Sequence, residues 1–190
     1  NYNGSEDFSV SVTDGNLSDS QSFTVTVNAV NDAPVLASVG DRETNEDEAL
    51  NFLLSASDVE GDLLTYNVSS GTNITSTLVG NDLTFTPAQD FNGSESFTIT
   101  VNDGELEDSE IFTLIVNAVN DAPVLASVSN VSFDEDGSGS TSLSAVDVDG
   151  DDLTFSVTGG TLITATLDGS DVLFSAPDNY NGSEDFSVTV

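Results

Sequence analysis

The chain has 190 residues, of which 34 are Asp or Glu and one, Arg42, is a cation, so its formal net charge at pH 7 is −33. This charge excludes a nucleic-acid-binding protein, because almost no side chain could neutralise phosphates. The absence of Cys and His excludes disulfides and removes thiol and imidazole chemistry. Bound cations or salt must therefore limit the repulsion between carboxylates.

Short alternating apolar runs recur along the chain, which is 37% hydrophobic, and this argues against disorder. Asp-Gly and Asn-Gly pairs that favour hairpin turns lie between the runs, and no helical periodicity extends over a useful length. The pattern predicts an all-β fold with about seven strands per repeat, typical of a β-sandwich. The expected strands cover residues 8–12, 22–27, 35–39, 49–55, 63–68, 74–79, 83–86, 97–101, 111–116, 153–157 and 172–175.

The chain is a tandem array with a period of 89 residues, because residues 28–39 recur word for word at 117–128. Residues 1–10 also recur unchanged at 179–188. We therefore expect three parts: 1–27, the C-terminal strands of a partial repeat; 28–116, a complete sandwich; and 117–190, a second repeat without its last strands. We also expect the array to be longer than this sequence.

The complete repeat should contain a hydrophobic core made by the inward-facing residues of its strands. Alternation along each strand selects one residue in two for this face. The expected core residues are Phe52, Leu54, Leu64, Tyr66, Leu83, Phe85, Phe97, Ile99, Val101, Phe112, Leu114 and Val116.

Acidic triplets around a glycine recur once per repeat. Asp147, Asp149 and Asp151 surround Gly150, and Asp58, Glu60 and Asp62 stand at the equivalent positions. Calcium prefers six to eight oxygen ligands, and such loops supply them, although neither loop has the spacing of an EF-hand.

Simple turns are the alternative interpretation of the polar motifs. Asn31 and Asp32 precede Pro34, where an Asx turn needs no metal. The Asp-Gly pairs that begin at Asp14 and Asp103 are equally consistent with hairpin turns.

Each period combines an Asn-Ala-Val-Asn-Asp-Ala-Pro linker, an acidic pair, a Gly-Ser-Glu-x-Phe segment and a late Asp-Gly. Together these motifs resemble the cadherin-like tandem repeats of giant calcium-dependent bacterial surface adhesins, including the repeats-in-toxin type. The linker resembles the cadherin Asp-x-Asn-Asp-x-Pro element, with Ala in place of its last Asn. The resemblance implies an Ig-like or cadherin-like β-sandwich with Ca²⁺ bound where repeats join.

The resemblance also implies which residues hold the ions. For the first junction they are Glu6, Asn28, Asn31, Asp32, Asp58, Glu60 and Asp103, with Asp62 as a further candidate. For the second they are Glu46, Glu95, Asn117, Asn120, Asp121, Asp147 and Asp149, followed by Asp47, Glu135, Asp136 and Asp151.

These features predict a non-catalytic, extracellular, calcium-binding spacer on a cell surface. Its expected partners are calcium ions and neighbouring repeats or copies of itself head to tail, with no nucleic acid and no membrane insertion in this segment. The alternative function is a filament subunit that assembles through strand complementation of the incomplete end repeats. Catalysis is disfavoured because no side chain offers a general base poised near neutrality.

Overall fold

The computed structural model describes residues 2–190, and every regular element in this range is a β-strand. The all-β prediction is therefore confirmed. The chain divides into two compact units, Asn1–Ala118 and Val119–Val190. No helix with the length and apolar character of a membrane span occurs among residues 2–190.

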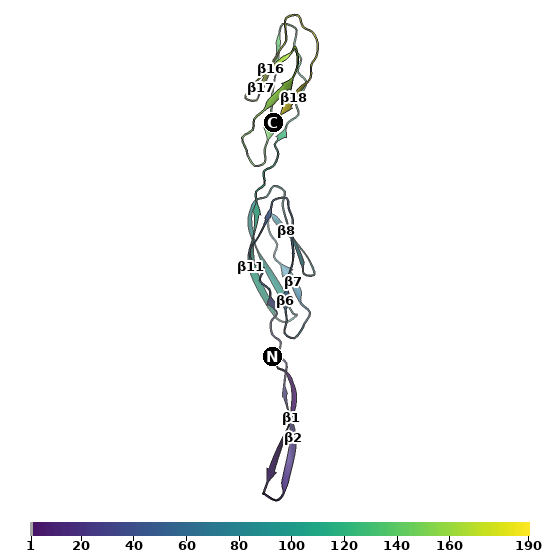
Figure 1. Cartoon of the computed structure of the whole chain (residues 1–190), viewed down its shortest axis with the longest axis vertical. Helices are drawn as coiled ribbons and strands as arrows, with labels where there is room; N and C mark the ends of the chain where they lie inside the picture. Colours follow the sequence, from purple (N-terminus) through teal and green to yellow (C-terminus); the bar gives the residue numbers. More distant parts are fainter. Residues whose placement is uncertain (1) are drawn as a thin grey trace. The chain divides into compact units, whose positions relative to one another are not determined.

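Unit 1 begins with a two-stranded antiparallel hairpin of β1 (Gly4–Thr13) and β2 (Ser18–Val27), drawn in purple in Figure 1. Its turn is closed by Asp14, whose Oδ1 accepts hydrogen bonds from the amides of Asn16 (2.8 Å) and Leu17 (2.7 Å). Backbone hydrogen bonds, first that of Leu17, lower the pKa of Asp14. The hairpin interpretation of this Asp-Gly pair is confirmed.

The rest of unit 1 is a complete β-sandwich, called here the complete domain. One sheet has the order β4-β11-β10-β7, in which only the β4–β11 pair is parallel, and the other has the order β5-β9-β8, while β3 pairs with β6. The strands are β3 (Val35–Leu36), β4 (Arg42–Asn45), β5 (Leu50–Leu53), β6 (Ala56–Ser57), β7 (Thr65–Val68), β8 (Ile74–Val79), β9 (Asp82–Pro87), β10 (Gly93–Asn102) and β11 (Glu107–Asn117).

Aromatic rings from both sheets meet in the core. Phe85 on β9 and Phe97 on β10 lie 4.5 Å apart between ring centroids, and Phe112 on β11 lies 5.7 Å from Phe85. Nine of the twelve expected core residues are buried, and the other three, Phe52, Leu64 and Tyr66, are partly buried against them. Leu36 and Ile74 also belong to the core, although the sequence analysis did not select them.

Carboxylates on β11 hold the start of the domain in place. Glu110 accepts hydrogen bonds from the Val39 amide (2.9 Å), the Ser38 hydroxyl (2.9 Å) and the Gly40 amide (3.3 Å), and these bonds lower its pKa. Asp108 accepts a bond from the Leu36 amide at 2.9 Å. These side chains stabilise a segment whose own strand, β3, has two residues.

Unit 2 repeats this plan without counterparts of β4 and β11. Its sheets have the orders β13-β17-β16, β15-β18 and β12-β14. Leu143 and Val172 are its buried hydrophobic residues among those described. The strands are β12 (Val124–Leu125), β13 (Ser138–Ser142), β14 (Ala145–Val146), β15 (Ser156–Gly159), β16 (Thr164–Asp168), β17 (Asp171–Ser175) and β18 (Phe186–Thr189).

Candidate metal centre

In unit 1, two hydrogen bonds attach the linker to the domain that follows it. The Asn31 side-chain amide donates to Asp103 Oδ2 at 2.9 Å. The Asp32 backbone amide donates to Glu60 Oε2 at 3.2 Å. The predicted Asn31, Asp32, Glu60 and Asp103 are thus brought together in pairs, and long-range contacts, rather than an Asx turn alone, occupy the two linker residues.

Asp58 organises the acidic loop of the same domain. Its Oδ1 accepts hydrogen bonds from the amides of Gly61 (2.8 Å) and Asp62 (3.0 Å), while Gly61 adopts a φ of 80° that suits glycine. Its Oδ2 is buried and has no hydrogen-bond partner among the described residues. A buried carboxylate oxygen without a partner is costly, and a hard cation is the natural ligand for it.

The Asp103 carboxylate accepts hydrogen bonds both from its own turn and from the linker. Its Oδ1 accepts hydrogen bonds from the amides of Glu105 and Leu106, both at 2.7 Å, and its Oδ2 receives the Asn31 amide. Backbone bonds from Leu106 and Glu105, followed by the Asn31 side chain, lower its pKa. The Asp-Gly pair is therefore a hairpin turn, as the alternative interpretation held, and the lowered pKa of its carboxyl group favours the charged form.

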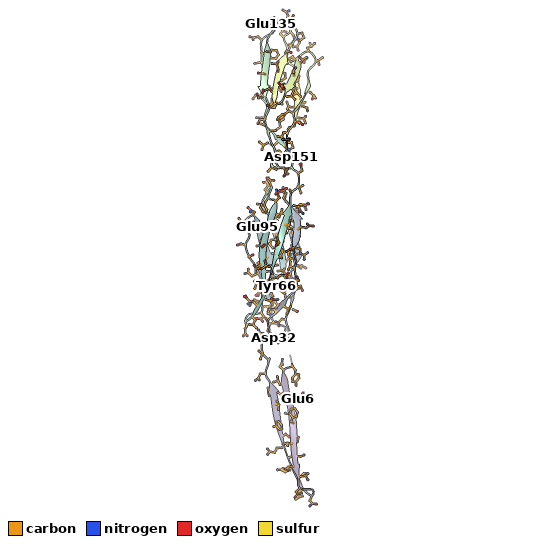
Figure 2. All side chains as sticks on the ribbon, turned by 90° about the vertical axis from the view of Figure 1, so that its left-hand side faces the viewer. Glu6, Asp32, Tyr66, Glu95, Glu135 and Asp151 are labelled. Carbon is orange, nitrogen blue, oxygen red and sulfur yellow. The ribbon has the colours of Figure 1, made fainter. Side chains whose placement is uncertain are left out.

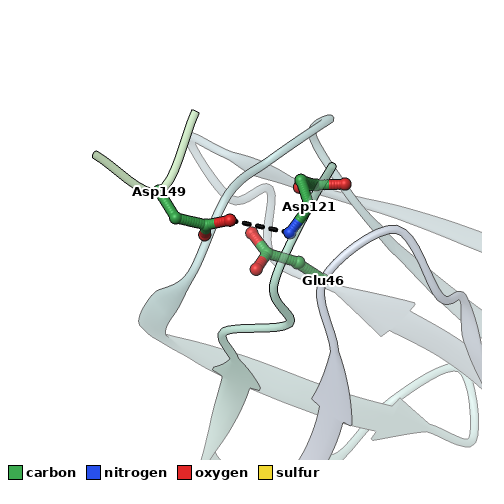
Figure 3. A group of neighbouring side chains, drawn as sticks. All are labelled: Glu46, Asp121 and Asp149. Carbon is green, nitrogen blue, oxygen red and sulfur yellow. Dashed lines mark hydrogen bonds between the residues drawn. The ribbon is translucent and has the colours of Figure 1, made fainter. Parts of the chain in front are cut away.

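Unit 2 repeats the loop geometry. The Asp121 amide donates to Asp149 Oδ2 at 2.7 Å (Figure 3), as Asp32 does to Glu60. A carboxylate oxygen of Asp121 and one of Asp149 lie within 4.8 Å of each other. Asp147 Oδ1 accepts the amides of Asp149 (3.0 Å) and Asp151 (3.2 Å), and the Asn120 side chain donates to the Asp121 carbonyl.

A second acidic group in unit 1 surrounds Glu46, whose side chain is only 4% exposed. The Glu46 amide donates to the Asn117 carbonyl at 2.9 Å, and the Asn92 side chain approaches Glu46 Oε2 at 3.5 Å. Beside it, the Asp90 amide donates to Asp47 Oδ1 at 3.2 Å, and carboxylate oxygens of these two residues lie within 4.8 Å. The sequence analysis missed Asp90 and Asn92, although their places in the repeat could have indicated them.

Positive backbone φ angles mark the Asp47–Asp90 pair as a fixed feature of the repeat. Asp47 and Asp90 have φ values of 60° and 55°, and the equivalent Asp136 and Asn179 have 63° and 58°. The Asn179 amide donates to Asp136 Oδ1 at 2.9 Å, which repeats the bond in unit 1. Asp and Asn tolerate this left-handed conformation better than most residues.

Two further predicted ligands accept or adjoin bonds within their own strands and loops. Glu95, predicted for the second junction, accepts hydrogen bonds from the amides of Asn73 (2.7 Å) and Thr72 (3.0 Å), and in Figure 2 it lies farther from Asp32 than Tyr66 does. Burial raises the pKa of Glu95, but these hydrogen bonds outweigh it and the net shift is downward. Glu6 accepts a bond from the Tyr2 hydroxyl at 3.3 Å within the hairpin, and Asn28 is exposed.

Sequence comparison settles the family. The Bacterial Ig domain family matches residues 31–115 and 120–190. The chain belongs to the bacterial Ig domain family. Such Ig-like domains are typical of secreted or surface proteins.

A curated protein and several solved structures are similar to this chain. Chitinase A of Pseudoalteromonas piscicida is 30% identical over 130 residues, which is 66% of this chain and 16% of the chitinase. The human protocadherin-24 EC1-2 structure is 20% identical with a TM-score of 0.50, over 84% of this chain and 95% of that one. PcdhgB3 EC1-4 is 14% identical with the same TM-score, over 92% and 49%. The structural similarity shows a cadherin-like fold alone, and with the acidic clusters it is compatible with Ca²⁺ binding.

Proposed function

We propose that this chain is a non-catalytic, calcium-binding spacer of a long bacterial surface adhesin. The bacterial Ig family and the tandem 89-residue period support an extended array. In such an array each domain contributes length and stiffness, and the binding of other molecules falls to domains elsewhere in the protein.

The buried, unpartnered Oδ2 of Asp58 is the observation that carries the calcium proposal. It lies in the loop whose Glu60 already meets the linker at Asp32. A cation held by Asp58 and Glu60 would strengthen the attachment of the linker to the following domain. In unit 2, Asp147, Asp149 and Asp121 offer the same kinds of donor.

The charge of the chain favours the same conclusion. With 34 carboxylates and one guanidinium, carboxylates outnumber possible internal ion-pair partners. Two charges about 5 Å apart repel by roughly 1 to 3 kcal/mol near a protein surface. A divalent cation removes this repulsion and replaces it with attraction, so the loops should become ordered when calcium binds.

The partial match to a chitinase does not favour catalysis by this chain. The match covers 16% of the chitinase, as expected for an accessory domain shared by proteins of different activity. Within this chain no His, Cys or Lys is present to activate a nucleophile.

Calcium titration with parallel thermal unfolding tests the proposal. Extracellular modules bind calcium at about 0.1 to 1 mM, so about 10 mM calcium should stabilise a tight site by roughly 2.7 kcal/mol. We expect saturable heat of binding and a raised melting temperature, with a smaller effect of magnesium because magnesium demands a tighter octahedron. Equal effects of calcium, magnesium and matched ionic strength of sodium would contradict the proposal.

A further inference from the structure

The longest uncharged stretch of the chain lies in the complete domain. No Asp, Glu, Lys or Arg occurs from Leu63 to Asn81, although 18% of all residues are charged. This stretch, called here the neutral segment, contains β7 and β8. The second longest uncharged stretch, Leu153–Leu167, lies in the equivalent part of the next repeat. The absence of charge here is therefore a feature of the repeat.

Both strands of the neutral segment are edge strands of the sandwich (Figure 1). β7 ends the sheet order β4-β11-β10-β7, and β8 ends the order β5-β9-β8. At the opposite edges, β4 contains Glu43, and Glu48 stands two residues before β5. Charges on an edge strand hinder pairing with another chain, and β7 and β8 contain none.

A groove of about 510 Å³ separates β7 from the hairpin of β8 and β9. The neighbouring Leu63 and Val79 are 85% and 73% exposed. An apolar surface and an uncharged strand edge therefore occur together, a combination typical of surfaces that pair with another strand. The lining residues all belong to the neutral segment: Leu64, Thr65, Tyr66, Leu78, Gly80 and Asn81.

The β8–β9 ladder shows which backbone groups of β8 point to the edge. The Ala88 amide donates to the Asn73 carbonyl at 2.7 Å. In an antiparallel strand, residues alternate between those whose backbone groups point to one neighbour and those whose groups point to the other side. The residues directed toward β9 therefore continue as Thr75, Thr77 and Val79. The residues directed to the edge are Ile74, Ser76 and Leu78, and no strand among residues 2–190 pairs with them there.

The beginning of this edge is covered by the loop that precedes it. The Ile74 amide is hydrogen-bonded to Glu95. A Cβ added at Gly71 would collide with the Ile74 carbonyl, so the loop lies directly against this residue. The open part of the edge is thus Ser76–Val79, beside the groove.

We propose that two copies of this chain pair side by side through β8, antiparallel to each other. Ser76 of each copy hydrogen-bonds to Leu78 of the other, and the two Thr77 residues face each other on the two-fold axis. The β5-β9-β8 sheets of the two copies then form one continuous sheet, in which each surface pairs with its own copy. Leu78 of each copy points to the inner face, where it covers the groove of the other.

The charge of the chain selects a second copy as the occupant of this edge. At a net charge of −33, two copies repel each other wherever their carboxylates meet, so the neutral segment is where they can approach closely. A cationic partner would bind the acidic loops instead. The sequence of β8, which is rich in β-branched residues and has no charge or Pro, also suits strand pairing.

This contact is separate from the calcium sites, because it uses neither Asp58 nor Glu60. It is a lateral contact between complete domains, and an array that repeats the neutral segment would strengthen it by multivalency. Its failure would leave the calcium-binding spacer proposal standing.

Cysteine trapping tests the pairing and its register. The chain has no native Cys. Opposed residues of a non-hydrogen-bonded antiparallel pair have Cα atoms about 4.5 Å apart, close enough for a disulfide. Under mild oxidation, Thr77→Cys chains should form linked dimers about tenfold faster than Thr75→Cys chains, whose cysteines would lie opposite Val79. Both side chains are exposed on one face of β8, so equal rates would overturn the proposal.

A charge placed on the two-fold axis gives a second test. Thr77→Asp sets two carboxylates opposite each other, whereas Thr86→Asp adds the same charge to the same sheet face on the central strand β9. In sedimentation equilibrium at about 0.15 M salt, the unmodified and Thr86→Asp chains should show masses that rise with concentration above 19.7 kDa. Thr77→Asp should keep the single-chain mass. A single-chain mass for all three chains, or equal association of all three, would overturn the proposal.

Discussion

The aligned phenylalanines of the repeat show how much burial depends on the neighbouring strands. Phe8 in the hairpin is 45% exposed, Phe97 in the complete domain is fully buried, and Phe186 in unit 2 is partly buried. The local sequence is nearly the same in all three places. The comparison teaches that alternation selects which face is apolar, whereas burial of that face requires the opposite sheet and β11.

The two linkers give a second comparison, since they share the same twelve residues. Asp32 and Asp121 both donate their amides to the acidic loop that follows, so this contact depends only on residues present in both units. Asn31 reaches Asp103, but Asn120 donates to the adjacent Asp121 carbonyl. Among residues 119–190 no counterpart of Asp103 is present to accept the Asn120 side chain.

The largest expected effect is the difference in stability loss between alanine substitutions at two aligned phenylalanines, Phe97 and Phe8. Phe97→Ala should destabilise unit 1 by about 3 to 5 kcal/mol, because it leaves a cavity among buried rings. Phe8→Ala should cost less than about 1.5 kcal/mol, since nearly half of Phe8 is already exposed to water. Hydrogen exchange of the β10 amides measures the first loss and exchange of the β1 amides measures the second, and equal losses would contradict the comparison.

Low pH should destabilise the complete domain by protonating Glu110, whose contact has no counterpart among residues 119–190. Hydrogen bonds from Val39 and Ser38 lower the pKa of Glu110, so its contribution to stability is present above the usual Glu pKa and is lost as pH falls through its folded value. Below about pH 4 the β7 to β11 amides should therefore lose protection.

Glu110→Gln is the matched variant for this prediction, because Gln keeps one acceptor oxygen but does not titrate. Glu110→Gln should weaken the loss of stability of unit 1 at low pH and leave the loss in unit 2 unchanged. The pKa values of Glu95 in unit 1 and Glu184 in unit 2 are also lowered, so both units should still lose some stability at low pH. An acid profile of unit 1 that is the same with and without Glu110→Gln would show that this contact does not operate.

The linker comparison predicts a smaller effect. Asn31→Ala should destabilise the linker contact of unit 1 by about 1 kcal/mol, because it removes the bond to Asp103. Asn120→Ala should cost less, since only a neighbouring carbonyl loses its partner. Protection of the amides of residues 31–36 against exchange, compared with that of 120–125, measures the difference.

The smallest expected difference between the two units concerns the residues with positive φ. Asp90→Ala and Asn179→Ala should each cost about 1 kcal/mol, because Ala is strained in this conformation, while Gly at either position should be nearly neutral. The geometry is the same in both units, so the two losses should agree. A loss confined to one unit would show that a different interaction determines the stability there.

Most strands were predictable because they depend on local alternation and on turn residues. β8 occupies its expected range, and β9, β10 and β11 extend beyond theirs. β4 was not predicted, because Arg42–Asn45 is polar and becomes a strand only by parallel pairing with the distant β11.

The candidate site was predictable in part for the same reason. Repetition of the acidic loop and linker indicated Asp32, Asp58 and Glu60, and the structure adds which atoms meet. The partners of Glu95 are loop amides 22 and 23 residues away, which no local pattern indicates. The amide of Asp90 likewise donates to the carboxylate of Asp47, far away in the sequence.

Calcium titration of the Asp58→Asn chain tests the central claim most directly. Asn retains the oxygen that accepts the Gly61 and Asp62 amides and loses the unpartnered carboxylate oxygen, so stability without calcium should change little. The account predicts that calcium affinity at this site falls at least tenfold, while Asp168→Asn, at the exposed end of β16, leaves it unchanged. Equal calcium affinity in the Asp58→Asn, Asp168→Asn and unmodified chains would contradict the account.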